Sequence, residues 1–116
     1  MANAVDLYIR AASERDPAAR AALLEACFAA DGRLVTTSRE LRGRAEVAAM
    51  LERFHATEPP RIRVTSAVDV RGTIFRFRSA VDRTDGTTLE FFDAGELDAD
   101  GRIKLIVTFA GPLADA

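Results

Sequence analysis

The second half of the chain alternates apolar and polar residues between short turns, and this pattern constrains the fold more than any other feature. Segments 62–70 and 75–81 alternate as strands with one buried face do, with apolar side chains at every second position except Ser66 and Ser79. Apolar residues also dominate segments 89–95 and 103–109. Pairs that favour tight turns separate these segments: Arg71-Gly72, Asp85-Gly86 and Asp100-Gly101. Four long strands in sequence predict an antiparallel meander.

Helical spacing dominates the first half of the chain. A helix from about Ala2 to Glu14 has one apolar face, formed by Val5, Tyr8, Ile9 and Ala12. A second helix begins after Asp16-Pro17, an N-cap followed by a first-turn proline, and extends to about Ala29. We expect Ala30-Asp31-Gly32 to close this helix. Its predicted inward residues are Ala22, Leu23, Ala26 and Cys27.

A short strand and a third helix precede the meander. The strand is predicted over Arg33–Thr37, and Ser38-Arg39-Glu40 is predicted to be a loop. The helix runs from about Arg44 to Ala56, and the prolines of Glu58-Pro59-Pro60 end it. Helices followed by a run of strands predict the α+β class. The residues that the third helix is predicted to bury are Val47, Met50, Leu51 and Phe54.

The composition argues against several classes of function. The chain of 116 residues is long enough for one domain, spanning residues 1–116, with one core. A formal net charge of −2 offers no electrostatic basis for binding nucleic acid or an anionic membrane, and the apolar stretches are too short to span a bilayer. With Cys27 as the single cysteine and no visible secretory signal, we expect a cytoplasmic protein. The lone histidine, His55, argues against a zinc site, and we expect neither metal nor cofactor.

Asp93 is the most informative residue of the predicted sheet. It interrupts the apolar run Leu89–Gly95 at a position that faces inward if the strand has one buried face. Burying an ionised carboxylate is costly, and such a group usually raises its pKa. An acid on an inward face therefore indicates a pocket. The alternative is that Asp93 pairs with Tyr8 or an arginine in a structural network.

Several local motifs accompany this order of elements along nearly the whole chain. They are Tyr8-Ile9, Phe28-Ala29-Ala30-Asp31, Leu41-Arg42-Gly43-Arg44, and Phe92-Asp93 followed by Asp98-Ala99-Asp100-Gly101-Arg102-Ile103. In this order and spacing the chain resembles the nuclear transport factor 2-like superfamily, which includes ketosteroid isomerases and polyketide cyclases of the SnoaL type. The resemblance implies three N-terminal helices packed on a strongly curved, mainly antiparallel sheet, which together form a cone-shaped α+β barrel with an apolar pocket.

The resemblance also implies roles for individual residues. Asp93 aligns with the acid that donates a hydrogen bond in the oxyanion hole of ketosteroid isomerases, and Tyr8 aligns with the other donor. The carboxylate base of those isomerases aligns with Thr36, whose hydroxyl does not exchange a proton at neutral pH without help. Steroid isomerisation by that mechanism is therefore not expected. Other residues predicted to line or approach the cavity are Phe54, Phe75, Phe77, Ile106 and Thr108.

Several hypotheses of function stay open at this point. The first is a small pocket protein that binds an apolar or mixed-polarity small molecule. The alternatives are an isomerase, cyclase or lyase-type enzyme that uses Asp93 and Tyr8 as catalytic groups, and a non-catalytic dimerisation module. His55 is predicted to be a solvated residue at a helix end. A cluster of arginines is predicted to be solvated, or to guide an anionic ligand: Arg39, Arg42 and Arg44.

The outer face of the predicted sheet suggests a partner. Arg76 and Arg78 alternate with the phenylalanines and therefore lie on this face, together with Ile74, Ala80 and Phe92. The resemblance implies that this face meets its copy in a symmetric homodimer.

Overall fold

Caps at the helix starts explain where the first two helices begin. The computed structural model describes residues 3–57, 61–111 and 115. Helix α1 spans Ala4–Ser13, and the Asn3 side chain accepts a hydrogen bond from the Asp6 backbone N–H. Helix α2 spans Pro17–Cys27, with Asp16 accepting from the Ala19 N–H and proline at its first position. Both starts agree with the sequence-based prediction.

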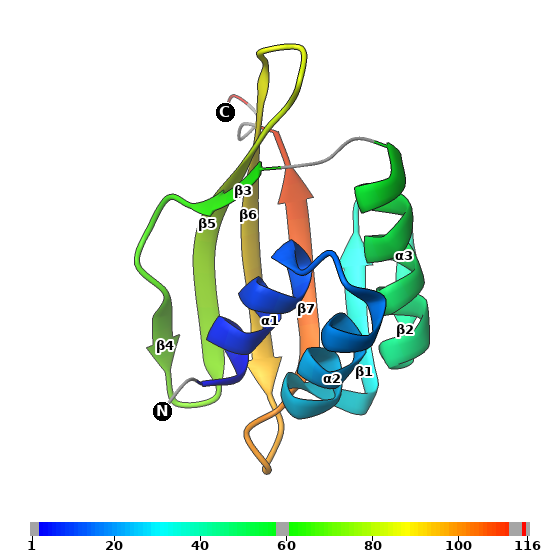
Figure 1. Cartoon of the computed structure of the whole chain (residues 1–116). Coiled ribbons are helices and arrows are strands. Elements are labelled where there is room, and N and C mark those ends of the chain that lie inside the picture. Colours follow the sequence, from blue (N-terminus) through cyan, green and yellow to red (C-terminus); the bar gives the residue numbers. More distant parts are fainter. Residues whose placement is uncertain (1–2, 58–60, 112–114, 116) are drawn as a thin grey trace.

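The strands form one curved sheet that the three helices cover on one face (Figure 1). Its order is β2-β1-β7-β6-β5-β3, and β4 pairs with β5 beside β3. All pairs are antiparallel except β1 with β7, which run parallel. The predicted α+β class, with helices packed on a curved and mainly antiparallel sheet, is confirmed. The strands are β1 Phe28–Thr36, β2 Glu40–Arg42, β3 Arg61–Val64, β4 Asp69–Arg71, β5 Ile74–Asp82, β6 Thr88–Leu97 and β7 Ile103–Ala110.

The predicted meander is present, but its first strand is divided. The segment expected as one strand over 62–70 forms β3 and β4, which pair with different halves of β5. Ser66 lies between them, and its hydroxyl oxygen accepts a hydrogen bond of 2.7 Å from the Arg78 backbone N–H. A side chain thus replaces a ladder partner there, which interrupts the strand despite its alternating pattern. The three turns predicted at glycine are found, with positive φ at Gly72, Gly86 and Gly101.

The second helix ends earlier than predicted; of its four predicted inward residues, Cys27 is buried and Leu23 packs half-buried against the core. It stops at Cys27, and β1 begins at Phe28, where a local irregularity precedes the regular pairing with β7. Its buried residues are Arg20, Leu24 and Cys27, whereas Ala22 and Ala26 are exposed. The prediction was wrong here because alanines occur all around this helix and do not define a face, and because pairing with β7 extends the strand.

The third helix agrees with its prediction, and a short strand precedes it. Helix α3 spans Gly43–Thr57; Val47 and Leu51 are buried, and Met50 and Phe54 are partly buried. The end predicted at Glu58-Pro59-Pro60 lies outside the described residues. Strand β2 was not predicted, because three residues paired to an edge carry almost no periodic signal.

A glycine lets the sheet and the core approach each other closely. A Cβ atom on Gly95 would lie 2.1 Å from the Leu105 carbonyl oxygen and 2.6 Å from Cζ of Phe75. The Phe75 ring therefore occupies the space over this part of β6. The buried core also includes Val5, Leu24, Phe28, Leu34, Val47 and Ile103. No helix among the described residues is long and apolar enough to cross a membrane.

Candidate functional site

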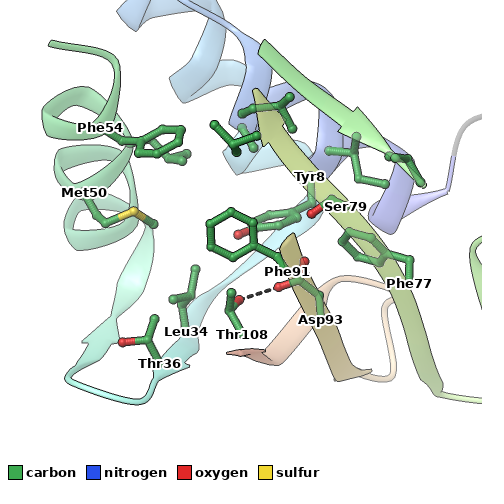
Figure 2. A pocket seen from close by; sticks show the side chains of 16 residues that line it. Tyr8, Leu34, Thr36, Met50, Phe54, Phe77, Ser79, Phe91, Asp93 and Thr108 are labelled. Atoms are coloured by element: carbon green, nitrogen blue, oxygen red, sulfur yellow. Dashed lines mark hydrogen bonds between the residues drawn. The ribbon is translucent and has the colours of Figure 1, made fainter. Parts of the chain in front are cut away.

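A pocket of about 240 Å³ lies between helices α1 and α3 and the inner face of the sheet. Its surface is almost entirely apolar, and Figure 2 shows side chains from both helices and from several strands turned toward it. This size exceeds the ~150 Å³ of a cavity that holds benzene, so the space suffices for a small organic molecule. The lining residues are Tyr8, Ile9, Ala12, Leu34, Thr36, Met50, Leu51, Phe54, Ile62, Val64, Phe77, Ser79, Val81, Phe91, Asp93 and Thr108.

The strand register places four of the predicted site residues in one row across the sheet. Thr36 of β1 is the partner of Thr108 on β7, and Thr108 is the partner of Asp93 on β6. Asp93 is in turn the partner of Phe77 on β5. Directly opposed residues point to the same face of a sheet. The row therefore forms part of the pocket wall, with Asp93 near its middle.

Asp93 is a buried acid with a single described hydrogen-bond partner. It is 6% exposed, and the Thr108 hydroxyl donates a hydrogen bond of 2.5 Å to its Oδ1 (Figure 2). Burial raises the pKa of this carboxyl to about 6, and the hydrogen bond from Thr108 opposes the rise. The acid therefore changes its charge near neutral pH, inside an apolar space.

Tyr8 supplies a phenol to the same pocket from helix α1. It is 7% exposed and lines the pocket together with Asp93. Burial raises the pKa of the phenol far above its ordinary value, and the neighbouring charge of Asp93 adds to the rise. The group is therefore a neutral hydroxyl at any ordinary pH. A neutral phenol can donate one hydrogen bond to a ligand and can accept another.

Thr36 lies at the edge of the pocket and is engaged in a turn. Its Oγ1 lies 3.2 Å from the Arg39 backbone nitrogen and 3.3 Å from that of Ser38, and it accepts from both. These bonds hold the turn between β1 and β2 and leave the hydroxyl little capacity for proton exchange.

Most of the predicted ligand-binding residues lie in the pocket wall, and two do not. Tyr8, Thr36, Phe54, Phe77, Asp93 and Thr108 line the pocket. Phe75 and Ile106 are instead part of the buried core. Both are strand partners of Gly95, and the Phe75 ring packs in the space that the glycine leaves. Inward direction was predicted correctly for them, but position along the strand decides between core and pocket.

Several lining residues were not singled out from the sequence. Phe91 and Ser79 follow from simple alternation, because each lies two positions from a named residue on the same strand, Asp93 or Phe77. Ile62 and Val64 reach the pocket because β3 pairs with the end of β5. Alternation in the sequence predicts which face of the sheet these side chains lie on. Only the strand pairing shows that they lie close to the pocket.

His55 is not the solvated residue that was predicted. Its Nε2 lies 2.8 Å from the Ala12 carbonyl oxygen, and this contact joins α3 to α1. Its Nδ1 is buried with no hydrogen-bond partner among the described residues. The ring packs edge-on against Phe54, with centroids 5.9 Å apart, but it does not line the pocket.

The arginines near the start of α3 do not enter the pocket. Arg42 is exposed and lies 3.5 Å from Glu40, which also pairs with Arg33. The Nε of Arg44 donates to the Phe28 carbonyl oxygen at 2.7 Å and so ties the start of α3 to β1. No group of three histidine, cysteine or acidic side chains suited to a metal occurs among the described residues.

Comparisons with known proteins place this geometry in a structural context. The sequence matches no protein-family model, and no curated protein matches it. A candidate isomerase of the SnoaL-like family from Agrobacterium tumefaciens is 26% identical, with a TM-score of 0.85 over 94% of this chain and 95% of that chain. A candidate polyketide cyclase from Sinorhizobium meliloti is 17% identical, with a TM-score of 0.75 over 93% and 94%.

A third similar structure contains a bound small molecule. It is a protein with a ketosteroid isomerase-like fold from Catenulispora acidiphila, in complex with trimethylamine. It is 16% identical, with a TM-score of 0.73 over 90% of this chain and 82% of that chain. These likenesses confirm the resemblance that the sequence motifs indicated.

Proposed function

We propose that this chain, which has the fold of the nuclear transport factor 2-like superfamily, is a small-molecule binding protein whose ligand lies beside Asp93 and Tyr8. The observation that carries the proposal is the position of Asp93, a 6% exposed acid in the wall of an apolar pocket. Burying a carboxyl in such a place costs free energy of folding, and acids with a strongly perturbed pKa in a pocket are candidates for functional groups.

The shape of the site supports a ligand of mixed polarity. The walls are formed by aliphatic and aromatic side chains, which favour an apolar body. Asp93 and Tyr8 are buried and provide an acceptor and a neutral hydroxyl for one polar end, and the buried Ser79 adds a second hydroxyl to the same wall. The trimethylamine complex of the Catenulispora protein supports small-molecule binding as a property to test in this chain.

An isomerase, cyclase or lyase-type activity is the second candidate. It is favoured by the pKa of Asp93, about 6, since an acid or base acts best when its pKa lies near the working pH. The candidate isomerase and the candidate cyclase among the similar structures support the same direction. Thr36 supplies no second acid–base group, so any such reaction relies on Asp93 for proton transfer.

A non-catalytic module is the weaker alternative. In that case its own side chains are expected to fill the space between helices and sheet, whereas a pocket of about 240 Å³ is open there. An unfilled apolar space of this size weakens a fold, because it forfeits packing contacts.

Native mass spectrometry of the purified protein tests the binding proposal. We expect a recurring small molecule in wild type, with affinity reduced about 10- to 100-fold by Asp93→Asn, because a hydrogen bond to a charged group is lost. Asp100→Asn is the matched control: it removes the same charge from an exposed turn. Undiminished affinity in Asp93→Asn would contradict the proposed site.

We also propose a symmetric homodimer through the outer sheet face, as the resemblance implies. This face carries exposed apolar side chains, including Ile74 at 57% and Phe109 at 50% exposure. It also carries charges of both signs, with Arg78 and Glu90 on adjacent strands β5 and β6. A twofold axis can therefore bring acids of one copy against arginines of the other.

A further inference from the structure

Among the described residues, the pocket wall contains an acidic side chain and no basic one, and this charge distribution indicates the charge of the ligand. None of the described residues that line the pocket is arginine, lysine or histidine. Asp93 forms no ion pair within the described part of the chain; burial raises its pKa, and the one hydrogen bond, from Thr108, opposes that rise. When Asp93 ionises, its charge therefore has no counter-charge in the pocket wall.

Aromatic rings surround the same space. Tyr8, Phe54, Phe77 and Phe91 all line the pocket, and Figure 2 shows their rings around the region that Asp93 faces. The face of an aromatic ring carries partial negative charge and attracts cations, with energies of about 0.5–2 kcal/mol for each contact. Rings and carboxylate thus favour the same sign of ligand charge.

One carboxylate oxygen is left for a ligand. Thr108 donates to Oδ1, and no described residue donates a hydrogen bond to Oδ2. An anionic ligand would meet Asp93 without any compensating positive side chain, which is unfavourable in an apolar space. A neutral ligand would leave the ionised acid unpaired. A cation supplies the missing partner.

We propose that the ligand is an organic amine: a protonated or quaternary nitrogen beside Asp93, carried on a compact apolar body. This inference rests on the proposed small-molecule function and adds the charge of the ligand to it. The Asp93 carboxylate pairs with the positive nitrogen, the aromatic rings contact its alkyl groups, and the aliphatic wall covers the rest.

A pair of probes that differ only in charge tests this assignment. Benzyltrimethylammonium carries a fixed positive nitrogen, and (2,2-dimethylpropyl)benzene has the same shape with a carbon in that place. Binding is followed by NMR on residues of the pocket. At pH 8 we expect the cation to bind wild type at least about tenfold more tightly than the hydrocarbon, and we expect Asp93→Asn to remove most of this preference.

The pH dependence in wild type gives a second readout that needs no variant. Because Asp93 has a pKa of about 6, lowering the pH from 8 to 5 is expected to weaken binding of the cation about tenfold. Among the described residues that line the pocket, Tyr8 is the only other titratable one, and it stays neutral throughout. Affinity for the hydrocarbon is expected to stay constant over this range.

The outcomes separate this inference from the function on which it rests. Equal or tighter binding of the hydrocarbon overturns the amine assignment and leaves small-molecule binding standing. A cation preference that survives in Asp93→Asn, with a flat pH profile, also overturns it. If neither probe binds, the amine assignment is also overturned. The proposed small-molecule function is then tested separately, by whether native mass spectrometry recovers a bound molecule.

Discussion

At the scale of single residues, the decisive quantity is the free energy that burying the Asp93 carboxyl costs. Its pKa rises from 3.8 to about 6, so the folded chain holds this proton over a range in which the unfolded chain releases it. The contribution of Asp93 to stability is therefore greatest below pH 4 and is lost as the pH rises to 6. The difference corresponds to about 3 kcal/mol.

The first prediction follows from this sign. Asp93→Asn keeps the size of the side chain and removes its titration, so the variant lacks the loss of stability between pH 4 and 6 that Asp93 causes in wild type. Urea unfolding at both pH values checks this, as the difference between the two proteins isolates Asp93 from the surface acids. Parallel pH profiles for the two proteins would count against a buried, unpaired acid.

A second residue-scale prediction concerns Gly95. A Cβ here would lie 2.1 Å from the Leu105 carbonyl oxygen, and backbone cannot move aside easily. Gly95→Ala is expected to lower the free energy of unfolding by at least about 2 kcal/mol. Ala99→Ser, in the exposed turn between β6 and β7, is expected to change it by less than about 0.5 kcal/mol. Chemical denaturation measures the free energy of unfolding of both variants. If alanine at position 95 leaves it unchanged, the backbone of residue 95 is not as close to the Leu105 carbonyl as described.

At the scale of elements, Arg20 of α2 links helices α1 and α3, which line the pocket. It is 2% exposed, and its guanidinium donates to the carbonyl oxygens of Glu14 and Arg15 in the α1–α2 connection. It also pairs with Glu52 of α3 at 2.6 Å. One buried arginine thus joins three helical segments.

The third prediction compares the two sides of this contact. Arg20→Met removes the buried guanidinium that donates to two carbonyl oxygens and pairs with Glu52, so we expect the free energy of unfolding to fall by about 3 kcal/mol. Glu52 is 56% exposed, and Glu52→Gln is expected to cost less than about 1 kcal/mol. Thermal and urea unfolding of both variants give the comparison. Equal losses would mean that the ion pair, and not the carbonyl contacts, holds the helices together.

Element boundaries show what the sequence could and could not predict. Alternation gave β5, and apolar runs bounded by turn residues gave β6 and β7. In helix α2, Cys27 and Leu23 were correctly predicted to face inward, but Ala22 and Ala26 were not, because alanine is compatible with either face; its buried Arg20 has the sequence character of a surface residue. The division of β3 from β4 depends on Ser66 meeting Arg78, a contact that periodicity does not contain.

The same limit applies to the candidate site. Asp93 stood out because an acid breaks an apolar strand, alternation supplied the face of Phe77, and the family resemblance placed Thr108 at the cavity. The row that brings these residues together comes from strand register. Phe75 and Ile106 share that face but lie beside Gly95 in the core, so a face alone does not separate core from pocket.

At the scale of the whole molecule, the outer sheet face leads to the fourth prediction. If this face joins two copies, Phe109→Glu places a charge in the interface. In sedimentation velocity, we then expect wild type to be a dimer and the Phe109→Glu variant to be a monomer. Ala21→Glu, on the exposed surface of α2, is expected to leave the dimer intact. A wild type that sediments as a monomer at high concentration would dismiss the dimer.

Asp93 is an acid in the wall of an apolar pocket, and titration of its carboxyl group tests the proposed site most directly. With the aspartate side chains labelled with ¹³C, NMR follows the carboxyl carbon of Asp93, assigned by comparison with Asp93→Asn, from pH 3 to pH 9. We predict a midpoint of about 6. A midpoint at or below the ordinary 3.8 would show that the carboxyl is solvated or paired, and would contradict the proposed site.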